Sequence, residues 1–220
     1  MKKKSAFTMI ELVFVIVILG IIASIAMDKT ERDLTQEASS TILSHIRLAQ
    51  QLALSDNKHR TDNDPKWQTA YWRFEYEKCD NSNRYIYRIG SDRDLSGGIN
   101  KMEAAIDPIN GKYLWADGAC DSFDDLASDE SRDVYLYGRF GVESISHSTT
   151  AGSCTSQNIG FDFLGRPHTG IKTYKKNGSN FQKLMTKDCI LTFTMSDRTS
   201  FKIRIEAETG HAFIVGQEDS

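Results

Sequence analysis

The sequence of 220 residues predicts an α+β fold in which a long N-terminal helix packs on an antiparallel β-rich globular head. Three patterns support this prediction. Residues 12–27 are almost uninterruptedly apolar, apolar residues recur every three or four positions over residues 28–58, and hydrophobic and polar residues alternate in segments beyond residue 69. A period near 3.6 residues is typical of a helix, and a period of two is typical of a strand. The helix is therefore expected to have a transmembrane half and an amphipathic half.

The composition allows a packed head and excludes several classes of protein. Hydrophobic residues make up 40% of the chain and charged residues 26%, which argues against wholesale disorder. The formal net charge is -3, so nothing in the overall charge indicates binding to a polyanion. The sequence contains no HExxH, GxSxG, P-loop or GxGxxG motif. We therefore expect a protein that is not an enzyme.

The first 27 residues have the layout of a membrane anchor. Three lysines at positions 2–4 precede an apolar run from Phe7 to Met27, which Thr8, Glu11, Gly20 and Ser24 alone interrupt. As a helix this run is roughly 30 Å long, about the thickness of a bilayer core. Lysines flanking a span stay cytoplasmic, so the rest of the chain is expected on the opposite side of the membrane.

A cleaved secretory signal peptide is the alternative interpretation of this segment, with Ala23, Ser24 and Ala26 as the small residues of the cleavage site. The length of the apolar run and Glu11 argue against it. A carboxylate inside a membrane segment costs at least ~2.5 kcal/mol and indicates a function.

The segment AFTMIE at residues 6–11, followed by the apolar run, resembles the N-terminus of type IV pilins and type II secretion pseudopilins. The resemblance implies that a prepilin peptidase cuts between Ala6 and Phe7, removes residues 1–6 as a leader and methylates the new N-terminus. It also implies that Glu11 is the glutamate that directs filament assembly. The chain has Ala6 where the family usually has Gly, and Asp28 where many members have Pro.

The resemblance also implies localisation and partners. Residues 7–27 would be a single-pass helix in the inner membrane, with the N-terminus cytoplasmic and the head periplasmic. The partners would be other pilin or pseudopilin subunits, the prepilin peptidase, and secretion cargo or DNA. Residues 160–167 (GFDFLGRP) and 209–214 (TGHAFI) resemble the head of H-type minor pseudopilins. The implied role is to initiate or cap a periplasmic filament.

Two other functions remain open. A competence or surface-pilus minor pilin would share the same N-terminus and contact DNA or a surface. A membrane-anchored periplasmic enzyme or binding protein would have a head with a different purpose.

Residues 28–58 are expected to continue the membrane helix, because their apolar positions form one stripe and no proline interrupts them. A separate surface helix after a break near Asp28 is the alternative. Residues 55–68 are expected to form a linker, and residues 69–220 the head. We expect strands at residues 69–78, 84–90, 134–137, 158–164, 189–195, 200–206 and 211–215, the last three forming a meander.

Four cysteines, none in a CxxC pair, lie on the predicted periplasmic side. An even count in an oxidising compartment predicts two disulfides. Three connectivities are possible, and we favour Cys79–Cys120 with Cys154–Cys189. The alternative is four buried thiols.

Residues 92–103 (DRDLSGGINKME) match the spacing of an EF-hand calcium loop. Such a loop wraps several oxygen atoms around one ion, with a glycine at the sharp turn, here Gly97. The preceding segment is a predicted strand, so a helix–loop–helix is not expected. The alternative is a solvated acidic turn. The candidate ligands are Asp92, Asp94, Ser96, Gly98, Asn100 and Glu103.

Overall fold

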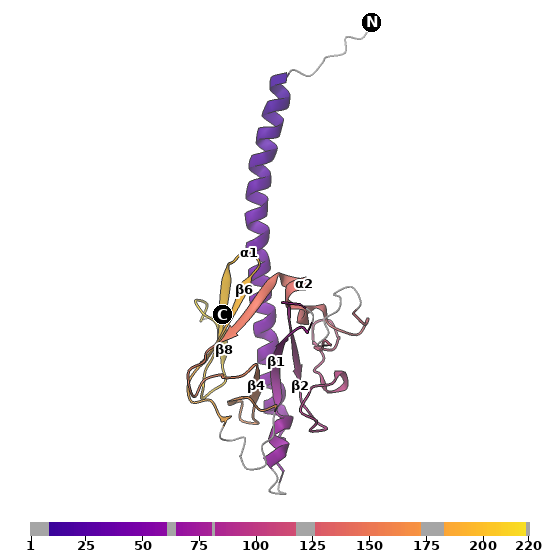
Figure 1. Cartoon of the computed structure of the whole chain (residues 1–220), viewed down its shortest axis with the longest axis vertical. Coiled ribbons are helices and arrows are strands. Elements are labelled where there is room, and N and C mark those ends of the chain that lie inside the picture. The colour runs from indigo at the N-terminus through magenta and orange to yellow at the C-terminus, as the bar shows by residue number, and fades with distance from the viewer. Residues whose placement is uncertain (1–8, 61–64, 81, 118–125, 173–182, 219–220) are drawn as a thin grey trace.

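The computed structural model describes residues 9–60, 65–80, 82–117, 126–172 and 183–218, and the side chains of residues 25–33 are outside this description. The fold is α+β, as predicted, with one long helix and two antiparallel sheets (Figure 1). The helices are α1 (Met9–Ser55) and α2 (Leu136–Phe140), and the 3-10 turns are η1 (Pro65–Ala70), η2 (Lys101–Glu103) and η3 (Arg132–Val134). The strands are β1 (Trp72–Lys78), β2 (Tyr85–Gly90), β3 (Val142–His147), β4 (Asn158–Phe161), β5 (Pro167–Thr169), β6 (Cys189–Met195), β7 (Ser200–Ile205) and β8 (Ala212–Ile214).

Helix α1 is continuous over 47 residues, so the alternative of a separate helix after Asp28 is wrong. At 1.5 Å per residue the helix is about 70 Å long. Its N-terminal half extends beyond the head, as Figure 1 shows. The large apolar side chains from Met9 to Ile22 are all exposed, each by 47% or more. A surface of this kind requires a partner, either lipid or protein.

The C-terminal half of α1 is the central element of the head. The predicted apolar stripe faces the sheets, and Ala38, Ile42, Ile46 and Ala49 are completely buried. The helix contacts β1, β2 and β4 of one sheet and β7 and β8 of the other. The stripe therefore packs against both sheets at once.

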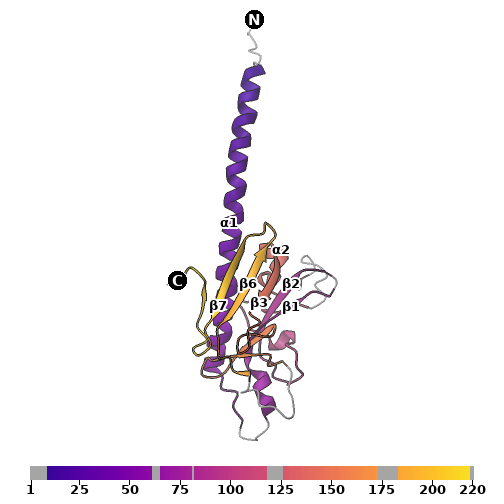
Figure 2. The same cartoon turned by 60° about the vertical axis from the view of Figure 1, so that its left-hand side comes forward.

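The two sheets are four-stranded and antiparallel, with the orders β2-β1-β4-β5 and β3-β6-β7-β8. Figure 2 shows β6 and β7 in front of α1. The predicted terminal meander is β6-β7-β8, and along β6 and β7 alternate side chains are buried. This alternation explains why the sequence predicted these strands well.

One strand prediction was wrong, and two strands were missed. Residues 134–137 are not a strand, because they end η3 and begin α2, which Gly141 terminates in a left-handed conformation. Strand β3 was missed, because a register shift between Val142 and Ser144 breaks its alternation. Strand β5 was missed because it has only three residues and starts with Pro167. The predicted linker at residues 55–68 also contains the start of η1.

A disulfide joins Cys154 to Cys189, which confirms one of the two expected pairs. Cys154 precedes β4 of one sheet and Cys189 begins β6 of the other, so the bond ties the sheets together. Chain entropy alone makes a crosslink over this 35-residue separation worth about 3–4 kcal/mol. Cys79 is also disulfide-bonded, and its expected partner Cys120 lies outside the described residues.

Two turns that are distant in sequence meet at the C-terminal part of α1. The side-chain amide of Gln50 donates hydrogen bonds to the carbonyl oxygens of Gly165 (3.0 Å) and Thr209 (2.8 Å). Gly210 has a φ of +69°, and a Cβ atom there would lie 2.1 Å from the Gly165 oxygen. Only glycine fits this position, both in conformation and in space.

We predict that Gly210→Ala lowers the free energy of unfolding by more than about 2 kcal/mol, because it adds a backbone clash to the cost of a left-handed residue. Gly111→Ala is the matched control, since Gly111 has a φ of +71° and no atom lies within 4 Å of the position that its added methyl group would occupy. The control should lose only about 1 kcal/mol. Denaturant unfolding of both variants measures the difference, and equal losses would show that the two turns do not pack closely.

Candidate functional site

The first candidate site is the exposed start of α1. Glu11 lies in the first turn of the helix, with exposed apolar side chains around it at Met9, Ile10 and Leu12. A carboxylate in the first turn is favoured by the positive end of the helix dipole. Ala6 and Phe7, the residues of the predicted processing site, lie outside the described residues.

Within the parts of the chain that the structure describes, no helix is both long enough and apolar enough to cross a membrane.

The second candidate site is the acidic loop that follows β2. One carboxylate oxygen each from Asp92, Asp94 and Glu103 lies within 4.8 Å of the other two. Asp92 and Glu103 are buried, whereas Asp94 is exposed at the mouth of the cluster. The fold therefore brings together the three carboxylates that the sequence spacing predicted.

Backbone N–H groups hold the two buried carboxylates in place. Asp92 accepts from the N–H groups of Ser96 (2.9 Å) and Gly97 (2.8 Å). Glu103 accepts from the N–H groups of Arg93 (2.7 Å), Asp94 (3.0 Å) and Asn100 (3.1 Å). A carboxylate offers about four lone-pair positions, so each of these side chains keeps capacity for a further ligand.

The other three candidate ligands have different positions in the loop. Ser96 donates its backbone N–H to both Asp92 and Asp94. Asn100 caps η2, where its side-chain oxygen accepts from the Met102 N–H (3.0 Å). Gly98 lines a cavity of about 580 Å³ beside the loop.

The conformation of the loop is costly without stabilising contacts. Leu95 has a φ of +59° and Gly97 a φ of +99°. A non-glycine residue in this region costs roughly 1–2 kcal/mol, and strain of this kind occurs preferentially at ligand sites. Gly97 thus lies at the sharp turn of the loop, as the sequence spacing predicted.

The pKa values of Asp92 and Asp94 are shifted in opposite directions. Burial raises the pKa of Asp92, although the Gly97 and Ser96 N–H groups and the Arg73 guanidinium oppose that change. Hydrogen bonds from Ser96 lower the pKa of exposed Asp94. Buried Arg73 donates to the Gly97 oxygen (3.3 Å) and pairs with Glu75 (3.0 Å). A cation bound between the carboxylates would stabilise the charged form of Asp92 and so offset the cost of burying it.

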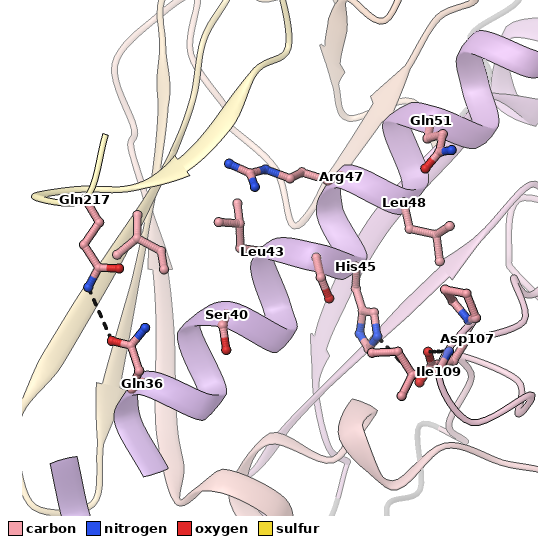
Figure 3. Close-up of a pocket in the computed structure, with 13 residues that line it drawn as sticks. Gln36, Ser40, Leu43, His45, Arg47, Leu48, Gln51, Asp107, Ile109 and Gln217 are labelled. Atoms are coloured by element: carbon pink, nitrogen blue, oxygen red, sulfur yellow. Dashed lines mark hydrogen bonds and ion pairs between the residues drawn. The ribbon is translucent and has the colours of Figure 1, made fainter. Parts of the chain in front are cut away.

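A third candidate site, which the sequence analysis missed, is a groove of about 420 Å³ along α1 (Figure 3). Asp107 and Ile109 line one end of the groove, and Gln217 lines the opposite end. His45, on the buried face of α1, lies with its ring Nε2 3.7 Å from Asp107 Oδ2. The sequence offers one signal for this site. His45 is a polar residue on the apolar stripe of the helix, where a buried side chain is expected.

Comparison with known proteins relates the N-terminus of the chain to a known family. Residues 1–27 match the family model described as the prokaryotic N-terminal methylation motif. No curated protein and no solved structure shows significant similarity to the chain. The matched segment contains the predicted processing site, Glu11 and the apolar run that α1 presents outside the head. The chain thus carries the prepilin-type N-terminal motif, which supports a protein of the type IV pilin-like kind.

Proposed function

We propose that the protein is a minor pseudopilin or pilin-like structural subunit of a type II secretion or type IV pilus machine. The observation that carries this proposal is the prepilin-type motif at residues 1–27, whose apolar part forms the start of a helix of 47 residues. Half of this helix is buried in the head, and the other half presents an apolar surface that has no partner within the described part of the chain. That arrangement suits a subunit that joins a helical bundle.

The proposed processing follows the order of the motif. A prepilin peptidase removes residues 1–6 and methylates Phe7, and residues 7–27 anchor the mature subunit in the inner membrane with the head in the periplasm. The subunit then assembles with other pilin or pseudopilin subunits to initiate or cap a filament. The H-type minor pseudopilins are the proposed subtype, and secreted cargo is a proposed contact of the head.

Glu11 has a physical role in this proposal. The amine of processed Phe7 is a cation and the side chain of Glu11 is an anion, and each is costly alone in hydrocarbon. Pairing Glu11 of one subunit with the Phe7 amine of its neighbour reduces both costs and sets the register between helices.

A competence or surface-pilus pilin that contacts DNA receives less support. Of the basic residues at 172–187, Lys172 pairs with Glu75 (2.6 Å) and Lys183 donates to the Gly170 oxygen. Residues 173–182 lie outside the described residues. We also favour a structural subunit over an anchored periplasmic enzyme. The motif and the long helix, which together cover the first 55 residues, are what a filament subunit needs.

We further propose that the acidic loop at residues 92–103 binds calcium. Calcium takes six to eight oxygen ligands, and the converging carboxylates of Asp92, Asp94 and Glu103 supply the charge. Water and the backbone of the loop would complete the set. The bound ion would hold the loop that leads from β2 to η2 and so stiffen this side of the head.

We predict that the mature protein begins at Phe7 and carries an N-terminal methyl group. Mass spectrometry of the protein isolated from membranes measures this terminus. Ala6→Gly, which restores the residue usual in the family, should be cleaved at the same bond. A mature terminus near Ala26 would instead establish a signal peptide and remove the basis of the proposed function.

We predict that Glu11→Ala leaves membrane insertion intact but impairs assembly. The variant removes the counter-charge of a neighbouring Phe7 amine, and an unpaired buried charge typically costs ~3–5 kcal/mol. Membrane fractionation tests insertion, and complementation of secretion or piliation tests assembly. Ser24→Ala, in the same apolar run, should behave as wild type. Full assembly by the Glu11→Ala variant would contradict the role of this glutamate.

We predict that the full-length chain melts at a higher temperature in millimolar calcium than in chelator. A calcium concentration 100-fold above the dissociation constant would stabilise the folded state by roughly 2.7 kcal/mol. Magnesium should do less, since it demands a smaller octahedral site. The double variant Asp92→Asn, Glu103→Gln should lose the effect, and exposed Glu143→Gln should keep it. An unchanged melting temperature in wild type would leave the loop as an acidic turn.

A further inference from the structure

The wall of the groove along α1 contains two buried polar atoms that lack hydrogen-bond partners among the described residues. These atoms are His45 Nε2 and Asp107 Oδ2, and they lie 3.7 Å apart. The His45 side chain is 2% exposed and the Asp107 side chain 1%. A buried donor or acceptor left unsatisfied costs about 1–3 kcal/mol, so two facing each other require an explanation.

We propose that His45 Nε2 and Asp107 Oδ2 are the two protein ligands of a site for a divalent transition-metal ion such as Zn²⁺. Imidazole nitrogen and carboxylate oxygen are both ligands of zinc, at about 2.0–2.2 Å. An ion at such distances from both atoms spans the observed gap of 3.7 Å with a bent geometry. One ion therefore satisfies both atoms.

The second hydrogen-bonding atom of each ligand already has a partner. His45 Nδ1 lies 2.7 Å from the Tyr87 hydroxyl, and Asp107 Oδ1 accepts from the Ile109 N–H (2.8 Å). Metal-binding histidines and carboxylates are oriented by such contacts, which fix the ring and leave the ligand atom aimed at the metal. In Figure 3 the His45 ring extends from α1 toward Asp107 and Ile109.

The surrounding charges favour a cation. Two carboxylates, those of Asp107 and Asp133, lie near the His45 ring. The Asp133 carboxylate pairs with Arg139 (3.1 Å). Arg47, the basic side chain that lines the groove, extends away from His45 and donates to the Ala212 oxygen (3.0 Å).

The groove leads from solution to the two ligand residues. His45 and Asp107 both line it, but Nε2 and Oδ2 are buried, so an ion and the water molecules that complete its coordination enter only when these side chains move. With only two protein ligands, the site binds zinc more weakly than a closed structural site with four. A bound ion clamps the loop at residues 107–109 onto α1 and so couples the helix to the head.

Equilibrium dialysis of the chelator-treated full-length chain against micromolar Zn²⁺ tests this site. The wild type is expected to bind zinc, and His45→Gln and Asp107→Asn should each weaken the affinity of this site at least about ten-fold. Tyr87→Phe, which removes only the orienting hydroxyl, should weaken it by about ten-fold. Exposed His211→Gln is the matched control and should bind as wild type.

Cobalt provides a second measurement, which starts from the wild type. Co²⁺ added to the wild type should give visible absorption bands that Zn²⁺ removes by competition. The double variant Asp92→Asn, Glu103→Gln should keep these bands, because its changes lie in the acidic loop. The proposal is overturned if wild type binds no zinc, or if folded His45→Gln binds it as tightly as wild type.

Discussion

The apolar stripe on the second half of α1 packs against both sheets, and the arrangement of the head depends on this contact. Ile42 and Ile46 are completely buried between the helix and the strands. Burying a side chain of this size stabilises the folded state by about 1.5–3 kcal/mol. Because strands of both sheets meet the same helix, the position of each sheet is set relative to α1.

Polar contacts give this apolar packing its register. Gln50 of α1 holds the turns at Gly165 and Thr209, which lie in different parts of the chain, and Arg47 donates to β8. Hydrogen bonds are directional, whereas apolar burial is not, so they select one rotation of the helix among several with similar burial. The disulfide from Cys154 to Cys189 adds a covalent tie between the sheets.

The two halves of α1 form one continuous helix but have different surroundings. The second half is covered by the head, while large apolar side chains along the first half are exposed. Because the helix is continuous, the position of its exposed half fixes the position of the head relative to it. The acidic loop and the groove both lie on the head, so ligands there would change its stiffness without touching the exposed half of the helix.

The sequence alone determined the features that depend on local patterns. Its continuous helical period and lack of proline predicted a helix through Asp28, the alternation at residues 189–206 predicted β6 and β7, and the spacing at residues 92–103 predicted three converging carboxylates. Its first 27 residues also predicted the motif that the family model matches. Each of these patterns involves residues close together in the chain.

Only the tertiary structure decided the rest, because long-range packing overrides local preference. The apolar alternation at residues 134–137 forms a turn and a short helix, where Leu136 and Phe140 are buried. Strand β3 pairs with β6 despite its irregular pattern. His45 and Asp107 are 62 positions apart in the sequence, so no local spacing could indicate that their side chains meet. Their contact exists because α1 and the loop after η2 are both fixed by the same core.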